Sequence, residues 1–528
     1  TRRYQEDTLV LETDFEAGSS AVRIIDFMPM REGEHSYLVR LVVGLRGEVP
    51  MRMDIAPRFS YGTLSPWMRL REDGFAGNVG PDLIVLRTPV TISHEERHVR
   101  ARFTVKEGER IPFVLSYGSS WKPEPPPIDP EQALRNTQRY WRDWVERFDK
   151  PTDWPEAVKR SLITLKALIY RPSGGLIAAP TTSLPEKPGG QLNWDYRYSW
   201  IRDATFTLDA LLNAGFHEEA RAWRDWMLCA IAGQPDEMRI MYKVDGARHI
   251  PEWDVPWLDG YGWARPVRVG NAASTQHQAD IYGELIDAMH LAARAGVERT
   301  ERCIEVETKI VEHIEKTWRE PGAGLWESRG EPRHYVYSRA MAWVGVDRFL
   351  KSKECREHAG PERVKRWEKL RGQIHSEVCN EGYHSGLGRF VEYYGGQTID
   401  ACLLLLPLVN FLPIDDPRIA ATIKAVEEEL MEGGLVRRKK PKSENPQGAF
   451  IVCTLWLADC QSMQGRDAEA RKTLERVLEI RNDLGLLSEE YNVRGRHLSG
   501  NFPQALSHLG LVTTSLGLCG PVLQRGGG

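Results

Sequence analysis

The sequence predicts a multidomain chain with an N-terminal antiparallel β-sandwich followed by an (α/α)6 barrel. The first 118 residues contain short β-branched or aromatic runs and no convincing helix. From about residue 154 onward, the apolar residues follow helical periods instead, and the helical segments come in pairs. At 528 residues the chain is also too long for one ordinary hydrophobic core. These observations favour two domains of different class.

The composition is that of a soluble globular protein, with 41% hydrophobic residues, 27% charged residues and a net charge of −4. This charge gives no case for a nucleic-acid or anionic-membrane partner. No apolar run approaches the ~20 residues that cross a bilayer. The eight cysteines lack metal-ligand spacing and indicate buried side chains in a reducing compartment. We therefore expect a cytoplasmic protein, and leave open a homo-oligomer and a signal peptide before Thr1.

Residues 1–120 are expected to form the β-sandwich. About eight short runs bounded by Gly, Pro or charged residues support it, among them Leu9–Thr13, Ala21–Ile25, Tyr37–Val43 and Phe113–Tyr117. Because the first run lies so close to the start of the chain, we expect the sandwich to be incomplete at its N-terminus. Residues 121–150 should form a stiff Pro-rich linker and a helix, over about 130–148, that bridges to the second domain.

Residues 151–520 are expected to form the barrel, and residues 521–528 a frayed tail. The clearest helix has Asp416 as N-cap, an apolar stripe from Ile419 to Leu430, and Gly433 as its stop signal. Similar patterns predict about twelve helices. They lie near 154–170, 202–214, 217–232, 275–295, 300–318, 335–351, 361–378, 397–408, 417–432, 448–463, 467–482 and 500–517.

Paired helices can stack as an open solenoid or close into a barrel. A solenoid should repeat its sequence at a fixed period, and this sequence has no such repeat. Several connections are short, whereas others are long and rich in Trp, Arg, Asp and Gly, at 183–201, 233–274, 319–334, 383–396 and 484–499. Long functional loops at one end of a rigid scaffold are typical of a barrel that carries a site. The closed barrel is therefore favoured.

The stretch 193–203 is the first candidate for a functional role. Its eleven residues hold four aromatic residues, two Asp and two Arg. Flat apolar faces beside fixed hydrogen-bonding groups suit a sugar ring. The alternative, to which the residues alone give about equal weight, is a loop whose aromatic rings pack in the core and whose ions pair at the surface.

Two groups of carboxylates lie in the long loops. Glu327 follows Trp326 just before a helix, and an apolar niche raises the pKa of a carboxyl group, as a general acid requires. Glu489–Glu490 lie in the last long loop, where Ser488 and Tyr491 could help to keep a base ionised. Glycoside hydrolysis uses two carboxylates in unlike environments. Spacing alone leaves structural roles open for both, because the chain holds dozens of Glu.

Four blocks, in order along the chain, resemble glycoside hydrolase family 15, the family of glucoamylases, glucodextranases and microbial trehalases. Residues 194–203 resemble its W-D-Y-R-Y-x-W-x-R-D block, and residues 268–284 resemble a segment conspicuous in bacterial and archaeal members. Residues 325–327 match the general-acid motif, and residues 488–491 match the S-E-[EQ]-Y general-base motif. The resemblance covers most of residues 1–515. The family's fold, an (α/α)6 barrel preceded by a β-sandwich, agrees with the patterns described above.

The resemblance implies an inverting, exo-acting hydrolase that releases β-D-glucose from the non-reducing ends of α-glucosides. Glu327 would protonate the glycosidic oxygen, and Glu489 would activate the attacking water. The two carboxyl groups should then stand roughly 6.5–9.5 Å apart. No cofactor and no metal are implied. The substrate-binding residues implied are Tyr196, which would hold the water, Trp200, Arg202, Asp203, Trp326 and, at the rim, Asp280.

Within this family we expect a glucoamylase-like α-glucosidase, with an α,α-trehalase as the alternative. Two other classes are an α-glucoside phosphorylase, which would not need the base Glu489, and a non-catalytic carbohydrate-binding protein. The chain departs from the family at Gln447, where relatives tend to carry Glu, and we interpret this position as a helix start. The basic run 437–442 is interpreted as a solvated loop.

Overall fold

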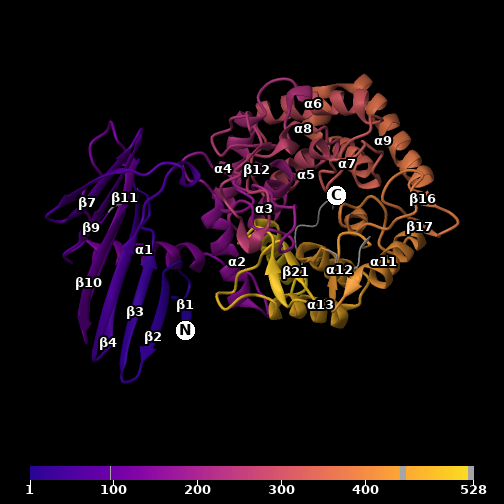
Figure 1. The fold of residues 1–528 in the computed structure, drawn as a ribbon. Coiled ribbons are helices and arrows are strands. Elements are labelled where there is room, and N and C mark those ends of the chain that lie inside the picture. The colour runs from indigo at the N-terminus through magenta and orange to yellow at the C-terminus, as the bar shows by residue number, and fades with distance from the viewer. Residues whose placement is uncertain (32, 96, 441–446, 521–528) are drawn as a thin grey trace. The chain divides into compact units, whose positions relative to one another are not determined.

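The computed structural model describes residues 1–31, 33–95, 97–440 and 447–520. The chain divides into two compact units, Thr1–Arg147 and Phe148–Gly528, whose ribbons are drawn in Figure 1. The helix predicted near 130–148 is α1 (Pro130–Glu146) and belongs to the first unit. The predicted tail, 521–528, lies outside the described residues.

The first unit contains two antiparallel sheets. An eight-stranded sheet has the order β1-β2-β3-β4-β11-β8-β7-β6, and a three-stranded sheet has the order β5-β10-β9. Their bounds are β1 Arg2–Tyr4, β2 Leu11–Ala17, β3 Ser20–Phe27, β4 Ser36–Arg46, β5 Glu48–Ile55, β6 Trp67–Arg71, β7 Gly74–Val79, β8 Asp82–Arg87, β9 Ser93–Glu95, β10 His98–Lys106 and β11 Arg110–Ser119. The predicted β domain is therefore confirmed.

Alternation along the strands explains why the large sheet has two covered faces. On β4, Val42 faces a core that also holds Val99 of the small sheet. Its neighbour Leu41 faces the other core, which holds Leu134 of α1. Successive side chains of a strand point to opposite faces. One face of the large sheet therefore packs on the small sheet, and the other face packs on α1.

The second unit is a closed ring of paired helices. The inner segments are α3 (Ile201–Asn213), α5 (Asp280–Arg294), α7 (Val336–Lys351), η5 with α10 (Ala401–Leu404 and Leu405–Leu408), α12 (Ile451–Met463) and α14 (Ala505–Gly517). Each contacts the next, and α14 contacts α3, which closes the ring (Figure 1). The outer helices are α2 (Pro155–Leu168), α4 (His217–Ala230), α6 (Glu301–Thr317), α9 (Pro361–Glu381), α11 (Pro417–Leu430) and α13 (Asp467–Glu479). The predicted (α/α)6 barrel is confirmed.

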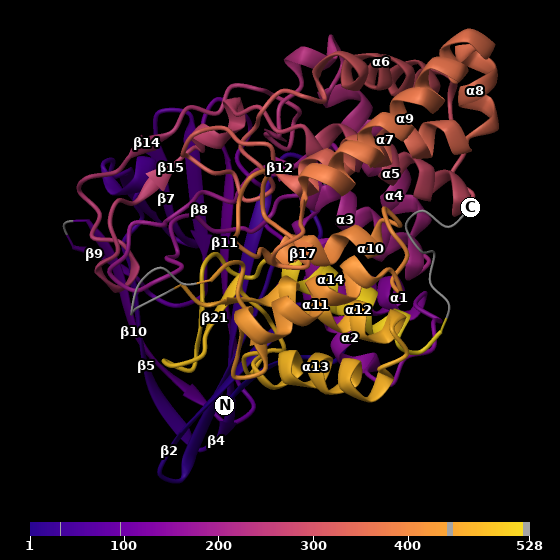
Figure 2. The ribbon, with the colours of Figure 1, turned by 90° about the vertical axis from the view of Figure 1, so that its right-hand side faces the viewer.

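Burial patterns account for the two layers of helices. Nearly every residue of α5 and α7 is buried, which is typical of a helix surrounded by protein. The outer helix α13 buries only the stripe of Ala470, Thr473, Leu474 and Val477. A short helix that we did not predict, α8 (Lys353–Ala359), lies between α7 and α9. Figure 2 gives a second view, in which α12 lies next to α14.

The long connections carry short ladders and single turns of 3-10 helix. The ladders are β12 (Ser199–Trp200) with β13 (Met241–Tyr242), β14 (Trp253–Asp254) with β15 (Arg268–Val269), β16 (Tyr383–His384) with β17 (Arg389–Phe390), β18 (Met431–Glu432) with β19 (Leu435–Val436), and β20 (Ala449–Phe450) with β21 (Glu490–Asn492) and β22 (His497–Ser499). The turns are η1 (Ser60–Gly62), η2 (Pro235–Glu237), η3 (Tyr261–Trp263) and η4 (Ala272–Thr275). Within the described ranges, no helix is both long and apolar enough to span a membrane.

Candidate active site

A pocket of about 330 Å³ lies where the long connections lead into the N-terminal ends of the inner helices. This volume lies in the range of small-molecule sites. Seven of the predicted site residues line the pocket: Tyr196, Trp200, Arg202, Asp203, Trp326, Glu327 and Glu489. Further lining residues include Glu186, Leu192, Trp194, Asn271, Ser328, Arg329, Arg438, Lys439, Gln447 and Phe450. Residues from distant parts of the chain therefore meet at one end of the ring.

Glu327 is held by donors on one of its two carboxyl oxygens. Its Oε1 accepts hydrogen bonds from Trp200 Nε1 at 2.7 Å and from Arg202 Nη2 at 3.3 Å. Burial raises the pKa of Glu327, and the nearby charge of Arg202 opposes this shift. Among the described residues, Oε2 has no recorded partner. A proton retained by this carboxyl group would therefore reside on Oε2.

Glu489 lies in a different environment. Its Oε1 accepts a hydrogen bond of 2.6 Å from the hydroxyl of Tyr196, and the residue is only 4% exposed. Burial raises the pKa of Glu489, the negative charge of Glu186 raises it further, and Arg438 opposes the shift. The expected help from Ser488 was wrong, because its hydroxyl donates to the carbonyl of Glu490 at 2.7 Å. The observed donor to Glu489, Tyr196, comes from a different loop.

Two aromatic rings connect the carboxyl groups. Tyr196, the donor to Glu489, packs edge-on against Trp200, the donor to Glu327, with ring centroids 5.4 Å apart. The two rings come from one stretch, so a single segment sets the positions of both carboxyl groups. The separation of 6.5–9.5 Å expected for an inverting pair remains a prediction.

Arg202 and Asp203 lie in the first turn of helix α3, and both line the pocket. Asp203 is buried, yet its Oδ1 has no hydrogen-bond partner in the described part of the chain. Buried polar atoms are usually hydrogen-bonded, so an unpartnered one in a pocket suits a ligand donor such as a hydroxyl group. Arg202 is fixed by a 2.5 Å hydrogen bond from Nη1 to the carbonyl of Leu325. Trp326 is fixed in turn by Asp400, which accepts from its Nε1 at 2.9 Å.

The structure places Asp280 away from the lining residues. Asp280 is 1% exposed at the start of α5, and its Oδ2 accepts a 2.8 Å hydrogen bond from the hydroxyl of Ser338 on α7. Asp280 is therefore buried between two inner helices and does not line the pocket.

The basic run 437–442 is not a solvated loop at its first three residues. Arg437 is 8% exposed, and both Arg438 and Lys439 line the pocket. Arg438 lies over the ring of Phe450 at 4.8 Å, and Lys439 Nζ lies 2.6 Å from a carboxylate oxygen of Glu392. Arg438 and Lys439 therefore form part of the wall of the site, whereas Lys440 is exposed, and residues 441 and 442 lie outside the described range.

Gln447 is also more than the start of a helix. It lines the pocket and donates from Nε2 to Oε2 of Glu186 at 2.8 Å, whereas α12 begins four residues later, at Ile451. Glu186 was not predicted, because it lies in a Pro- and Gly-containing loop without a local motif. Glu186 can be identified as part of the site only from its contacts in the folded protein, such as those with Gln447 and Arg438.

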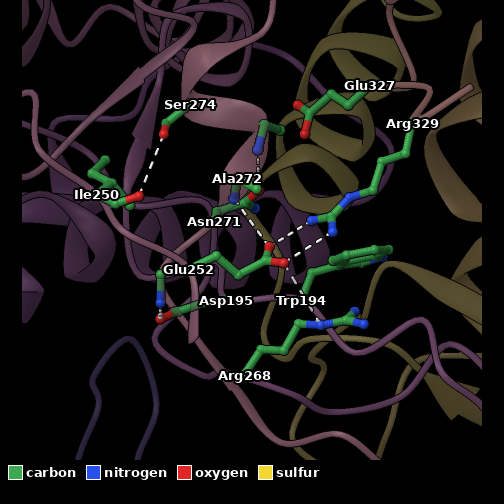
Figure 3. Close-up of polar contacts among 12 residues, drawn as sticks. Trp194, Asp195, Ile250, Glu252, Arg268, Asn271, Ala272, Ser274, Glu327 and Arg329 are labelled. Atoms are coloured by element: carbon green, nitrogen blue, oxygen red, sulfur yellow. Dashed lines mark hydrogen bonds and ion pairs between the residues drawn. The ribbon is translucent and has the colours of Figure 1, made fainter. Parts of the chain in front are cut away.

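A cluster of cations and one carboxylate supports Trp194 on the other side of the pocket (Figure 3). The guanidinium groups of Arg268 and Arg329 lie 4.6 Å and 4.3 Å from the indole ring. Both Nη atoms of Arg329 donate to Glu252, which also accepts from the amide of Ala272 at 3.0 Å. These contacts hold the indole of Trp194, which lines the pocket. Among the described residues, no group of three or more His, Cys, Asp and Glu could hold a metal ion.

Comparisons with known proteins agree with this geometry. A family model described as glycosyl hydrolases family 15 matches residues 154–516, and a model described as trehalase-like, N-terminal matches residues 1–141. A protein of Mycobacterium tuberculosis named trehalase is 35% identical over 97% of this chain and 80% of its own length. A trehalase of Thermoplasma acidophilum is 33% identical over 96% of this chain and 88% of its own length. The solved glucoamylase from Saccharomycopsis fibuligera aligns with a TM-score of 0.52 at 11% identity, over 71% of this chain and 98% of its own, and so shares the fold.

Proposed function

The chain belongs to family 15 of the glycosyl hydrolases and is a hydrolase of O-glycosyl bonds, and on this premise we propose that it cleaves α,α-trehalose with inversion. The proposal is supported by relatives named trehalase that align over nearly the whole chain, and by the trehalase-like model over residues 1–141. The expected preference for a glucoamylase-like α-glucosidase is less well supported than the trehalase alternative. Likeness to a glucoamylase is likeness of fold.

The observation that carries the proposal is the pair of buried carboxyl groups in unlike settings within one pocket. Glu327 acts as the general acid. Burial raises its pKa and so favours the protonated form that a general acid needs. Because Oε1 accepts from Trp200 and Arg202, the proton is carried on Oε2. From there it passes to the glycosidic oxygen as the bond to the anomeric carbon breaks.

Glu489 acts as the general base. It must be ionised to remove a proton from the attacking water, so activity rises with pH through the pKa of Glu489. The hydrogen bond from Tyr196 fixes Oε1 and leaves Oε2 for the water. The water attacks the anomeric carbon from the face opposite Glu327, so the glucose at this position leaves as the β anomer.

The glucose that is attacked occupies the half of the pocket walled by Trp200 and Trp326. Asp203 accepts from its hydroxyl groups, because Oδ1 lacks a partner among the described residues, and Arg202 donates to it. The second glucose occupies the half lined by Trp194, Ser328 and Arg329. This half would distinguish trehalose from longer α-glucosides.

Proton NMR of anomeric signals at early times tests the substrate and the stereochemistry together. The purified protein is incubated in parallel with trehalose, maltose and isomaltose. Inverting hydrolysis of trehalose yields one β-glucose and one α-glucose per event, and we expect trehalose to be cleaved fastest. Only α-glucose from trehalose would mean a retaining mechanism and would contradict the roles of Glu327 and Glu489. Faster cleavage of maltose would restore the glucoamylase-like assignment.

A further inference from the structure

Glu186 is a fourth carboxyl group in the pocket, beside Asp203, Glu327 and Glu489, and its contacts join the two halves of the site. It is 3% exposed. Oε1 accepts from Trp194 Nε1 at 3.1 Å, on the side of the second sugar. Oε2 accepts from Gln447 Nε2 at 2.8 Å and from Arg438 Nη2 at 2.7 Å. Every hydrogen bond recorded for this buried carboxylate therefore comes from a group that lines the pocket.

The single positive charge of Arg438 acts on three carboxyl groups, those of Glu186, Glu490 and Glu489. Its Nη2 donates to Glu186 and, at 3.0 Å, to Oε1 of Glu490, which is fully buried. Its charge also acts on Glu489, the proposed base. Three buried carboxyl groups thus depend on one guanidinium group. A like charge close by disfavours ionisation of a carboxyl group, and an opposite charge favours it.

The other charged or titratable groups that face Glu489 are few. The hydroxyl of Tyr196 donates to it, and Asp203 on α3 and the adjacent Glu490 add repulsive charges. None of these groups provides a positive charge. The contact between Glu186 and Arg438 is the part of this environment that can be changed without altering a residue that contacts Glu489.

We propose that Glu186 is a positioning residue that holds Trp194 and Gln447 for the second sugar and, through Arg438, sets the pH at which Glu489 becomes an active base. The proposal rests on the proposed function in two respects, that Glu489 is the base and that the second sugar lies beside Trp194. Ionised Glu186 draws on the charge of Arg438 and repels a charge on Glu489, so it raises the pH at which the base is formed. The neutral amide of Gln447 avoids adding a fourth carboxyl group to this cluster.

Two substitutions that preserve side-chain shape but change the charge in opposite directions test whether Glu186 influences Glu489. Glu186→Gln removes a negative charge, and Gln447→Glu adds one next to Glu186. The pH profile of kcat/KM reports the pKa of the base in the free enzyme. We expect the acidic limb to move to lower pH by roughly one unit in Glu186→Gln. In Gln447→Glu it should move to higher pH.

Glu186→Asp separates charge from position. It keeps the charge but shortens the side chain, so the limb should stay within a few tenths of a unit of wild type while KM rises. A matched control is Glu307→Gln, because Glu307 is also buried and paired with an arginine, Arg299, but lies on α6 and does not line the pocket. This control should leave the limb in place. If Glu186→Gln lowers kcat/KM without moving the limb, Glu186 is merely structural and the proposal is wrong.

The test does not depend on trehalose, because the profile can be measured on any glucoside that the wild type cleaves. If the wild type cleaves none, the proposed function fails, and the ionisation can be followed instead by infrared titration of the C=O band of protonated carboxyl groups. This band should disappear at lower pH in Glu186→Gln than in the wild type. Coinciding titrations in the two proteins would overturn the inference in either case.

Discussion

Glu327 adopts a left-handed backbone conformation, with φ of 55°. For a residue other than glycine this conformation costs on the order of 1 kcal/mol, and it persists only where the surroundings impose it. Here Gly324 provides the turn, because a Cβ atom at that position would lie 2.7 Å from the ring of Tyr335. The amide of Glu327 donates back to the carbonyl of Gly324 at 3.1 Å. The backbone strain therefore lies at the residue proposed as the general acid.

The first prediction concerns the two proposed catalytic carboxyl groups. Glu327→Gln and Glu489→Gln should each reduce turnover by orders of magnitude. The thermal midpoint should stay within a few degrees or rise, because burial disfavours the charged form of both groups. Enzyme assays and thermal denaturation would check both parts. Near wild-type activity in both variants would show that the catalytic pair is wrongly assigned.

The second prediction concerns the support of Trp194. Glu252→Gln removes the negative charge that holds Arg329 and faces Arg268. Losing a charge-assisted contact of this kind costs about 1–2 kcal/mol. We expect KM for trehalose to rise roughly tenfold while kcat changes little. Steady-state kinetics would measure this, and a loss of kcat at unchanged KM would place the effect on the catalytic groups instead.

Individual site residues could be predicted from the sequence where they belong to a short motif. Residues that belong to the site only through contacts with distant parts of the chain could not. Tyr196, Trp200, Arg202 and Asp203 lie in one block, so their association was visible along the chain. Glu186 and Arg438 are 252 residues apart, and no local pattern joins them. Their role depends on a contact that exists only after the ring has closed.

Helices α5 and α7 approach each other closely at a pair of glycines. A Cβ atom at Gly283 would lie 1.9 Å from the carbonyl oxygen of Met341, and one at Gly345 would lie 3.3 Å from Cα of Gly283. Because both helices are inner helices, this approach sets the positions of Asp280 and of the loop that carries Glu327. The packing of two elements thus bears on the geometry of the pocket.

The third prediction compares the same substitution in two helices. Gly283→Ala must push α5 from α7 and should cost at least 1–3 kcal/mol, because overpacked cores cannot absorb the added volume. Gly372→Ala on the outer helix α9 meets nothing within 4 Å and should be neutral or stabilise by up to about 1 kcal/mol. Chemical denaturation of both variants would measure the difference. Equal effects would show that the close approach is unimportant.

The fourth prediction concerns His508 on α14, which contacts both α2 and the loop that carries Glu489. It is fully buried, accepts from the amide of Leu487 at 3.2 Å, and lies 3.0 Å from the hydroxyl of Ser161. Burial lowers the pKa of His508 from 6.5 to about 3. Between these values the unfolded chain binds more protons than the folded one. Stability should therefore fall as the pH is lowered through this window, by about 1.4 kcal/mol per pH unit.

His508→Gln tests the assignment. The variant should be less stable at pH 7, because it loses the hydrogen bonds, but its thermal midpoint should fall less steeply on acidification. Thermal denaturation at several pH values below 6.5 would compare the two proteins. Parallel curves would mean that other groups cause the acid sensitivity.

The helical elements were predicted well where a single amphipathic period is present, as in α11 and α13. The start of α5 was predicted too early, near 275 rather than 280. Asn271 caps a separate turn, η4, by accepting from the amide of Ala273, and the chain leaves helical geometry at Gln276. The residues between η4 and α5 therefore interrupt the helix that the sequence pattern predicts from residue 275. Asn271, which caps η4, lines the pocket.

At the scale of the whole molecule, the two units differ in the sequence separation of the contacts that complete them. The first unit has its own cores between its sheets and under α1. The second unit depends on a contact between its first and last inner helices, α3 and α14. The absence of a sequence repeat predicted a closed ring, but no pattern could tell which residues would meet where the ring closes.

The fifth prediction divides the ring. A break after Gln464, in the tight turn between α12 and α13, separates Glu327 from Glu489 without cutting a helix or a loop of the site. Each fragment alone should be inactive, and co-expression should restore hydrolysis. Activity assays on the separate and the co-expressed fragments would decide, with a Glu489→Gln fragment as the inactive control. Activity of the first fragment alone would contradict the need for closure.

The hydrogen bond from Tyr196 to Glu489 lies where the ring closes and joins residues 293 positions apart. An open stack of hairpins is least stable at its two ends, where hairpins fray. Here the two ends of the ring meet at Glu489, the proposed base, so its hydrogen bond with Tyr196 joins the ends at which fraying would otherwise begin. A nascent chain that ends before residue 489 contains Glu327 but lacks Glu489 and its hydrogen bond to Tyr196. The proposed acid and base therefore come together only after five of the six inner segments of the ring have been synthesised.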